Sequence, residues 1–212
     1  MIIRSVPRQV MMIMVLILLL PFPAIGQEKL NSVSFKGGIY VPTSDLDDFD
    51  NGLYTDVMYN RYFSKHIAME AGVGLYATKA TYNGVLPVVG SFTEEDEITV
   101  IPFKINFKGI FPFPIGEFYV GAGIGLYFAR AESRVTSTGL GSFSIDDGTA
   151  VIGGQFKAGA IFNLNETLFL GFEGEYMLTD TAEFSGSVAG FPVKIESDLN
   201  GYAITGVFGF RF

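Results

Sequence analysis

The last twelve residues of the chain constrain its fold more than any other stretch. Along a β-strand, successive side chains point to opposite faces. From Gly201 onward, one face is mostly small and carries a single charge, Arg211, whereas the other is large and apolar: Tyr202, Ile204, Phe208, Phe210 and Phe212. Chain ends usually fray. An aromatic residue at the carboxyl terminus therefore indicates a strand whose apolar face is covered, and membrane lipid would cover it.

This closing strand resembles the terminal strand of small bacterial outer-membrane β-barrels, the OmpA/OmpX/OmpW-like group. The resemblance extends over the chain as a pattern of alternation rather than as one long motif. It implies an integral outer-membrane location in contact with membrane lipids and lipopolysaccharide. In that group the barrel-assembly machinery reads the terminal strand, so the resemblance also implies an assembly signal at Phe208, Phe210 and Phe212.

The amino-terminal segment has the features of a secretory signal. Arg4 and Arg8 precede an apolar run from Val10 to Leu20, and Ala24-Ile25-Gly26 is a small-x-small cleavage site. A membrane-spanning helix needs about 20 apolar residues, and this run is shorter. We expect residues 1–26 to be a cleaved signal peptide and residues 27–212 to form one outer-membrane β-barrel domain.

Composition narrows the class of protein further. The formal net charge is −8, with 14 basic and 22 acidic residues, and removal of residues 1–26 takes away two arginines and no acid. Such an acidic chain is a poor partner for nucleic acid, whose phosphates need a basic surface. The chain has no cysteine, which excludes disulfides and thiol chemistry. Hydrophobic residues make up 49%, yet residues 27–212 hold no apolar run of helix-spanning length, as expected of a membrane barrel.

Alternation and turn signals predict an all-β fold, an eight-stranded antiparallel up-and-down transmembrane β-barrel. The expected strands cover residues 33–41, 53–63, 67–77, 98–110, 118–129, 150–164, 168–178 and 201–212. Their connections are alternately long and short, which matches the outer loops and periplasmic turns of such barrels. We expect a loop from about 79 to 96 and a short connection at 111–116. Residues 135–138 with 142–145, and 184–188 with 191–195, keep the alternation and should form hairpins that protrude beyond the membrane.

The inward-facing positions of these strands collect charged residues. Eight strands leave an interior that side chains just fill, and buried charges must be paired. The sequence therefore predicts a mutually neutralising network inside the barrel, and the functional alternative is an ion path. The predicted network consists of Lys36, Asp56, Glu70, Lys104, Lys108, Lys157, Glu173, Glu175 and Arg211.

Motifs for catalysis or cofactor binding are weak. Gly121-Ala122-Gly123-Ile124-Gly125 lacks the spacing of a dinucleotide fingerprint and lies within a predicted strand, so we expect no cofactor. Some small barrels that resemble this one modify lipid A or phospholipids, chemistry that uses a serine with a histidine base. The single histidine, His66, falls in a predicted periplasmic turn, at the wrong end for the outer leaflet. We expect no enzyme.

Charges near the strand ends suggest weaker surface roles. Asp45, Asp47, Asp48 and Asp50 offer oxygen ligands, although their spacing does not fit a calcium loop, and they could bridge a divalent cation to lipopolysaccharide. Arg61, Arg130 and Arg134 could pair with headgroup phosphates.

Three functions remain open. The first is a non-enzymatic barrel whose long loops serve envelope integrity or surface interaction, with a ligand that the sequence does not identify. The second is a narrow channel for small or hydrophobic solutes, as OmpW-like members suggest. The third and weakest is a lipid A-modifying enzyme.

Overall fold

The computed structural model describes residues 30–86, 90–137, 141–188 and 191–212. The predicted signal peptide, residues 1–26, lies outside this part of the chain. The described elements are β1 (Asn31–Pro42), η1 (Ser44–Leu46), β2 (Gly52–Ser64), β3 (Ile67–Leu86), β4 (Gly90–Phe113), β5 (Gly116–Ser137), β6 (Gly141–Asn163), β7 (Leu168–Thr179), β8 (Thr181–Val188), β9 (Phe191–Asp198) and β10 (Gly201–Arg211). In the part of the chain described, no helix is long and apolar enough to span a membrane.

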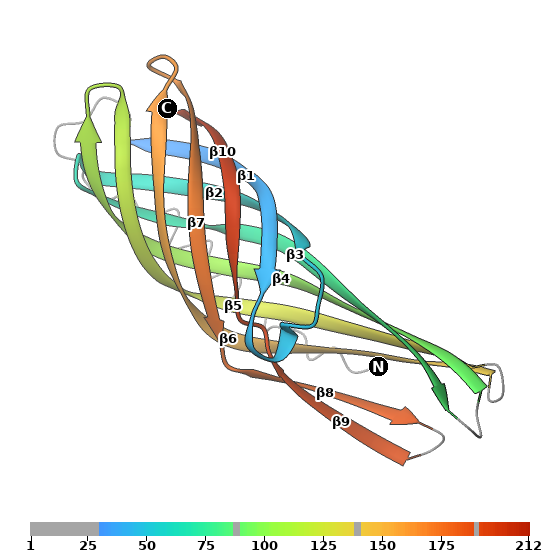
Figure 1. Ribbon diagram of the computed structural model, residues 1–212. Helices are drawn as coiled ribbons and strands as arrows, with labels where there is room; N and C mark the ends of the chain where they lie inside the picture. Colours follow the sequence, from blue (N-terminus) through green and yellow to red (C-terminus); the bar gives the residue numbers. More distant parts are fainter. Residues whose placement is uncertain (1–29, 87–89, 138–140, 189–190) are drawn as a thin grey trace.

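Eight of these strands close into one antiparallel barrel in the order β1-β10-β7-β6-β5-β4-β3-β2 (Figure 1). The first and last strands close the ring, with Val33 opposite Phe210 and Ile39 opposite Ile204. The predicted eight-stranded up-and-down barrel is therefore confirmed. β8 and β9 pair only with each other, as a separate two-stranded sheet at the end of the barrel opposite the tight turns.

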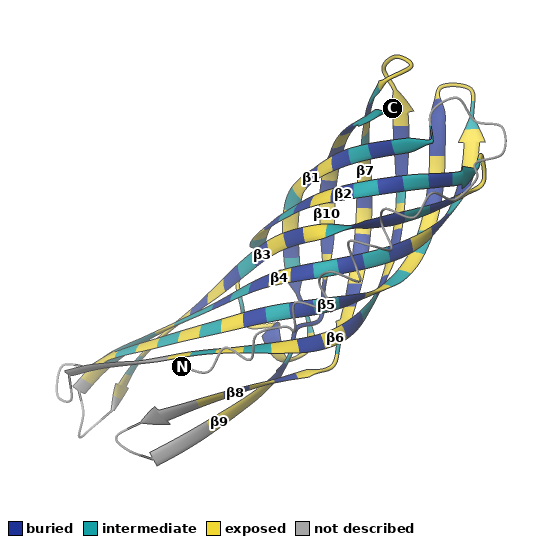
Figure 2. Cartoon of the chain, turned by 180° about the vertical axis from the view of Figure 1, so that it is seen from behind, coloured by how far each residue is buried: buried dark blue, intermediate teal, exposed yellow. Residues whose placement is uncertain are grey.

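The barrel is apolar outside and polar inside. Buried and exposed residues alternate along the strands (Figure 2) because the pleat sends neighbours to opposite faces. On β7, Phe172 is 57% exposed and the adjacent Glu173 only 2% exposed. On β5 the outer face is apolar from Phe118 to Phe128, and Arg130 is its first charged residue. This arrangement suits a lipid environment around the wall.

Strands β3 and β4 run further than the sequence predicts. The loop predicted from about 79 to 96 is wrong, because pairing continues from Lys79 opposite Glu97 to Leu86 opposite Gly90. The outward face of this segment is largely polar, with Lys79, Thr81, Thr93 and Glu95, so the apolar outward period that reveals a strand in the membrane is missing. Ladder hydrogen bonds need no apolar face, and the wall continues beyond the lipid-facing band.

The other connections show a similar difference. β6 begins at Gly141 rather than near residue 150, and Phe113 pairs with Gly116, which shortens the predicted 111–116 connection to two residues. The first predicted hairpin extends the barrel wall, with Val135 opposite Phe143. The second is the separate β8–β9 sheet, with Phe184 opposite Ile195.

We call the described segments beyond the lipid-facing band the crown, defined as residues 43–51, 79–86, 90–97, 130–137, 141–148, 180–188 and 191–198. The crown lies at the end with the long connections, which in such barrels faces outward from the cell. It carries 15 acidic and 4 basic residues, and thus most of the 22 acids of the chain.

Candidate functional site: the barrel interior

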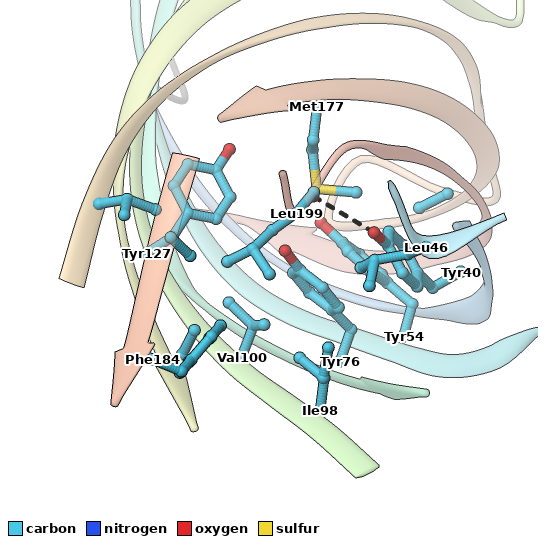
Figure 3. Packing of buried hydrophobic residues seen from close by; sticks show 14 residues of the cluster. Tyr40, Leu46, Tyr54, Tyr76, Ile98, Val100, Tyr127, Met177, Phe184 and Leu199 are labelled. Atoms are coloured by element: carbon cyan, nitrogen blue, oxygen red, sulfur yellow. Dashed lines mark hydrogen bonds between the residues drawn. The ribbon is translucent and has the colours of Figure 1, made fainter. Parts of the chain in front are cut away.

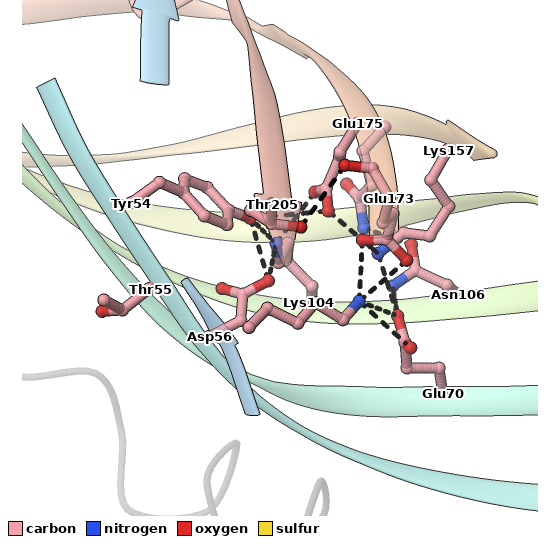
Figure 4. A network of polar contacts seen from close by, with 12 residues as sticks. Tyr54, Thr55, Asp56, Glu70, Lys104, Asn106, Lys157, Glu173, Glu175 and Thr205 are labelled. Atoms are coloured by element: carbon pink, nitrogen blue, oxygen red, sulfur yellow. Dashed lines mark hydrogen bonds and ion pairs between the residues drawn. The ribbon is translucent and has the colours of Figure 1, made fainter. Parts of the chain in front are cut away.

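Inward positions on six strands bring charged side chains together at mid-barrel (Figure 4). Each is at most 5% exposed, because the pleat that turns its neighbours toward lipid turns it toward the axis. Eight of the nine residues predicted from the sequence lie in this group, which we call the lumen network: Lys36, Asp56, Glu70, Lys104, Lys108, Lys157, Glu173 and Glu175.

Lys157 links the carboxylates at the centre of the lumen network. Its Nζ lies 2.9 Å from Glu70 Oε1 and 2.9 Å from Glu175 Oε2. Lys36 approaches from β1, with Nζ 2.8 Å from Glu173 Oε1 and 3.3 Å from Glu70 Oε2. Each of these carboxylates thus meets cations from more than one strand, and the pairs form one connected cluster.

The two lysines of β4 extend the cluster along the axis. Lys104 Nζ lies 2.8 Å from both Asp56 Oδ2 and Glu175 Oε1, and it also donates to the Tyr54 hydroxyl. Lys108 Nζ donates to Glu70 Oε2 at 2.9 Å and lies 4.2 Å from the centre of the Tyr119 ring. Four lysines therefore face four acids, which is the balance that charges removed from water require.

Glycine makes room for these long side chains. A Cβ at Gly121 would lie 3.2 Å from Cγ of Lys108 and 3.2 Å from Cγ of Lys157. The glycine-rich run 121–125 lies within β5, as the alternation predicts, and its glycines leave space in the lumen for these side chains.

Arg211, the ninth predicted residue, does not join the lumen network. It lies near the tight turns, where its guanidinium approaches Glu117 Oε2 at 3.3 Å and donates to Asn163. Sequence reasoning missed Glu117, because the predicted strand began one residue later. The alternation that places Tyr119 inward would have placed Glu117 inward as well.

A cluster of buried aromatic and apolar side chains lies toward the crown end of the barrel interior (Figure 3). The Tyr40 and Tyr76 rings lie 4.4 Å apart, and the Tyr40 hydroxyl donates to the Asn200 carbonyl oxygen at 2.9 Å. We define the aromatic plug as the buried side chains Tyr40, Tyr54, Tyr76, Tyr127, Leu46, Phe184 and Leu199. The predicted barrel strands contain the four tyrosines, whereas Leu46 comes from the loop after β1, Phe184 from β8, and Leu199 from the connection between β9 and β10.

A second apolar cluster lies toward the other end of the lumen. It contains Tyr62, Ala68, Ile110, Tyr119, Ile161, Phe169 and Val207. The ions of the lumen network are therefore held between two apolar layers, where water has little access.

His66 and Arg61, also singled out from the sequence, have structural partners. A ring nitrogen of His66, in the β2–β3 turn, lies 3.2 Å from the Ile110 carbonyl oxygen. Arg61 donates to Asn31 Oδ1 at 2.9 Å, at the end with the tight turns. Over the described residues, no three acidic or histidine side chains gather as a metal site, including the acids of loop 43–51.

Arg130, predicted to meet headgroups, pairs with acids of the crown instead. Its guanidinium donates to Asp146 Oδ1 at 2.8 Å and Oδ2 at 2.6 Å, and it lies 3.1 Å from Glu132. This hydrogen bonding lowers the pKa of the Asp146 carboxyl from its ordinary value. The pair joins β5 to β6 just beyond the lipid-facing band.

Comparisons with known proteins agree on the fold. A family model described as outer membrane protein beta-barrel domain matches residues 12–212. The chain is similar to the outer membrane protein OprG from Pseudomonas aeruginosa, with 15% identity and a TM-score of 0.53, over 87% of this chain and 97% of that one. It is also similar to a major outer membrane protein from Thermus thermophilus, with 12% identity and a TM-score of 0.51, over 88% and 100% of the two chains. No curated protein matches the sequence.

Proposed function

This chain belongs to the outer membrane protein beta-barrel domain family, and we propose that it is a non-enzymatic barrel with a sealed lumen whose crown serves envelope integrity or surface interaction. It is an integral β-barrel of the bacterial outer membrane, and its apolar wall lies in membrane lipid. The proposal concerns what this barrel does there.

The filled interior is the observation that carries the proposal. The aromatic plug, the lumen network and the second apolar cluster follow one another along the axis, and their side chains are buried. A channel needs a continuous polar path, whereas here ion pairs as short as 2.8 Å cross the lumen from wall to wall. Eight-stranded barrels are generally narrow enough for side chains to fill them in this way.

The position of His66 supports the non-enzymatic part. It is the only histidine of the chain, it lies in the turn at the end opposite the crown, and its ring contacts a backbone carbonyl. A serine–histidine pair acting on outer-leaflet lipid would need both groups at the crown end.

The crown supports the surface part of the proposal. It adds a separate hairpin, β8–β9, to the extended walls, and it concentrates acidic side chains there. Lipopolysaccharide and other envelope molecules are the partners within reach of this end. The assembly signal at Phe208, Phe210 and Phe212 and its reading by the barrel-assembly machinery belong to the same proposal.

Conductance across planar lipid bilayers tests the sealed lumen. Pure refolded protein should insert without steady nanosiemens-scale openings, while a general porin under the same conditions gives them. Steady openings of the pure protein would contradict the proposal and favour the narrow channel. Heat-modifiable migration on a gel shows that the inserted protein is folded.

A further inference from the structure

The crown forms a partly open pocket of about 210 Å³ beside the aromatic plug. Three parts of the chain surround it: the loop of residues 43–51, the crown ends of β4 to β6, and the β8–β9 hairpin. We call it the crown pocket. Its acidic lining includes Asp45, Glu94, Asp96 and Asp147, and its apolar lining includes Leu46 and Phe184.

Two of these acids are held in place by the backbone. Asp45 Oδ2 accepts a hydrogen bond from the Asp198 N–H at 3.0 Å, and Asp147 Oδ2 accepts one from the Ser185 N–H at 2.6 Å. Both donors belong to the β8–β9 hairpin, which is thereby fastened over the pocket. The carboxylates on either side of the cavity are thus fixed rather than free to turn into bulk water.

The other two acids carry charge that no described cation balances. The described ion pairs of the crown join Lys79 to Glu97, Arg130 to its two acids, and Lys194 to Glu183 and Glu196. None of these ion pairs includes Glu94 or Asp96, which occupy successive inward-facing positions of β4 on either side of Glu95. Burial and the neighbouring Asp96 raise the pKa of the Glu94 carboxyl, as expected where negative charge is unneutralised.

A second observation points to a ligand-binding role for the crown pocket. Ser197 lines the crown pocket, is only 7% exposed, and its Oγ has no hydrogen-bond partner within the described residues. It shares one face of the hairpin with Phe184, since Ser197 pairs with Ala182 and Ile195 with Phe184. Asp96 Oδ1 is likewise buried without a partner. Buried polar atoms are rarely left without a hydrogen-bond partner. A ligand that brings hydrogen-bond donors into the pocket would give a partner to both Ser197 Oγ and Asp96 Oδ1.

The chemistry of the lining selects the kind of ligand. A compact metal ion needs several oxygens around one point, and the described acids do not gather in that way. An ammonium group has three donors and suits separated carboxylate and hydroxyl oxygens, while methylene groups suit the apolar lining. The volume is below the roughly 300–1,000 Å³ of pockets for drug-sized ligands, so the ligand must be slender.

We propose that the crown pocket binds an aliphatic polyamine, with ammonium groups at Glu94, Asp96 and Ser197 and methylene groups over Leu46 and Phe184. This site deepens the surface role proposed above and rests on it. The polyamine supplies the positive charge that the basic residues of the crown do not bring to Glu94 and Asp96. It also draws the β8–β9 hairpin toward β4.

Isothermal titration of the folded full-length barrel in detergent with spermidine tests the site. Glu94→Gln and Asp96→Asn should each weaken binding about tenfold or more, the effect of losing one charged hydrogen bond. Glu95→Gln is the matched control, because Glu95 lies between them on β4 but faces outward and is exposed. It should change the affinity about twofold or less, as expected for a screened exposed charge. Each variant should keep heat-modifiable migration.

Three results would overturn the site. The first is no spermidine binding above the heat of dilution. The second is equal weakening by Glu95→Gln and Glu94→Gln, which means diffuse counterion attraction. The third is equally tight binding of hexaamminecobalt(III), a cation of the same charge without methylene groups. The bilayer recordings are independent of all three, so a failure of this site can be told apart from a failure of the sealed lumen.

Discussion

At the scale of single residues, the lumen network depends on shared partners. Glu70 accepts hydrogen bonds from Lys36, Lys108 and Lys157, and it is fully buried. A buried ion pair contributes little net stability compared with apolar packing, but removal of one partner leaves the other as an unpaired buried charge. Single neutralisations should therefore cost much more than paired ones.

Glu70→Gln should lower the free energy of unfolding by about 3–5 kcal/mol, the usual cost of breaking a buried pair. Urea unfolding in lipid vesicles measures the loss. Adding Lys157→Met to Glu70→Gln should recover part of the lost free energy of unfolding, because one unpaired buried cation is removed as well. Additive losses from the two changes would contradict a coupled network.

Asp146 predicts a pH effect in the crown. The hydrogen bond from Arg130 lowers its pKa in the folded protein, so the pair stabilises the β5–β6 extension above the unfolded pKa, and this is lost as pH falls through the folded value. Amide exchange in residues 131–136, corrected for its intrinsic pH dependence, should rise below about pH 4. Asp146→Asn should remove that rise, and an unchanged response in this variant would contradict the assignment.

At the scale of elements, the sequence predicts strands well only where one face meets lipid. The strict alternation of β5 from Phe118 and of β10 places every inward residue, and the same alternation on the other strands places eight members of the lumen network. Between residues 79 and 97 the outward face of β3 and β4 is polar rather than apolar, so the sequence predicts a loop there although the two strands stay paired. Leu46 and Leu199 join the aromatic plug through tertiary contacts that no local period records.

The β8–β9 hairpin should be separable from the barrel. β7 pairs directly with β10, from Met177 opposite Gly201 onward, so replacing residues 181–198 with a short Gly-Ser linker leaves the ring intact. The variant should still assemble in the outer membrane and migrate heat-modifiably, and its surface role should be impaired. Loss of assembly would show that the hairpin belongs to the folding unit.

At the scale of the whole molecule, the last strand closes the barrel and is also proposed to carry the signal for assembly in the outer membrane. Phe212 is 54% exposed and Phe172 on β7 is 57% exposed, so the two side chains face lipid to a similar extent. Only Phe212 belongs to the proposed assembly signal, directly after the strand that closes the ring. The two phenylalanines therefore differ in the proposed assembly signal but have similar exposure in the folded barrel.

Phe212→Ala should reduce the amount of assembled barrel in cells severalfold, with refolding into detergent close to the parent protein. Phe172→Ala is the matched control and should leave cellular assembly nearly unchanged. Quantitative outer-membrane fractionation compares the two. Equal losses would contradict a signal at the carboxyl terminus and indicate a general need for aromatic surface.

The proposed barrel has lipid outside and a dry, sealed interior. The chain has no cysteine, so Phe172→Cys and Thr205→Cys can each carry a single nitroxide label in vesicles. Phe172 faces outward and Thr205 is 4% exposed inside the barrel. Electron paramagnetic resonance should find the label at 172 accessible to oxygen but not to a water-soluble nickel reagent, and the label at 205 shielded from both. Nickel accessibility at either position would contradict the account.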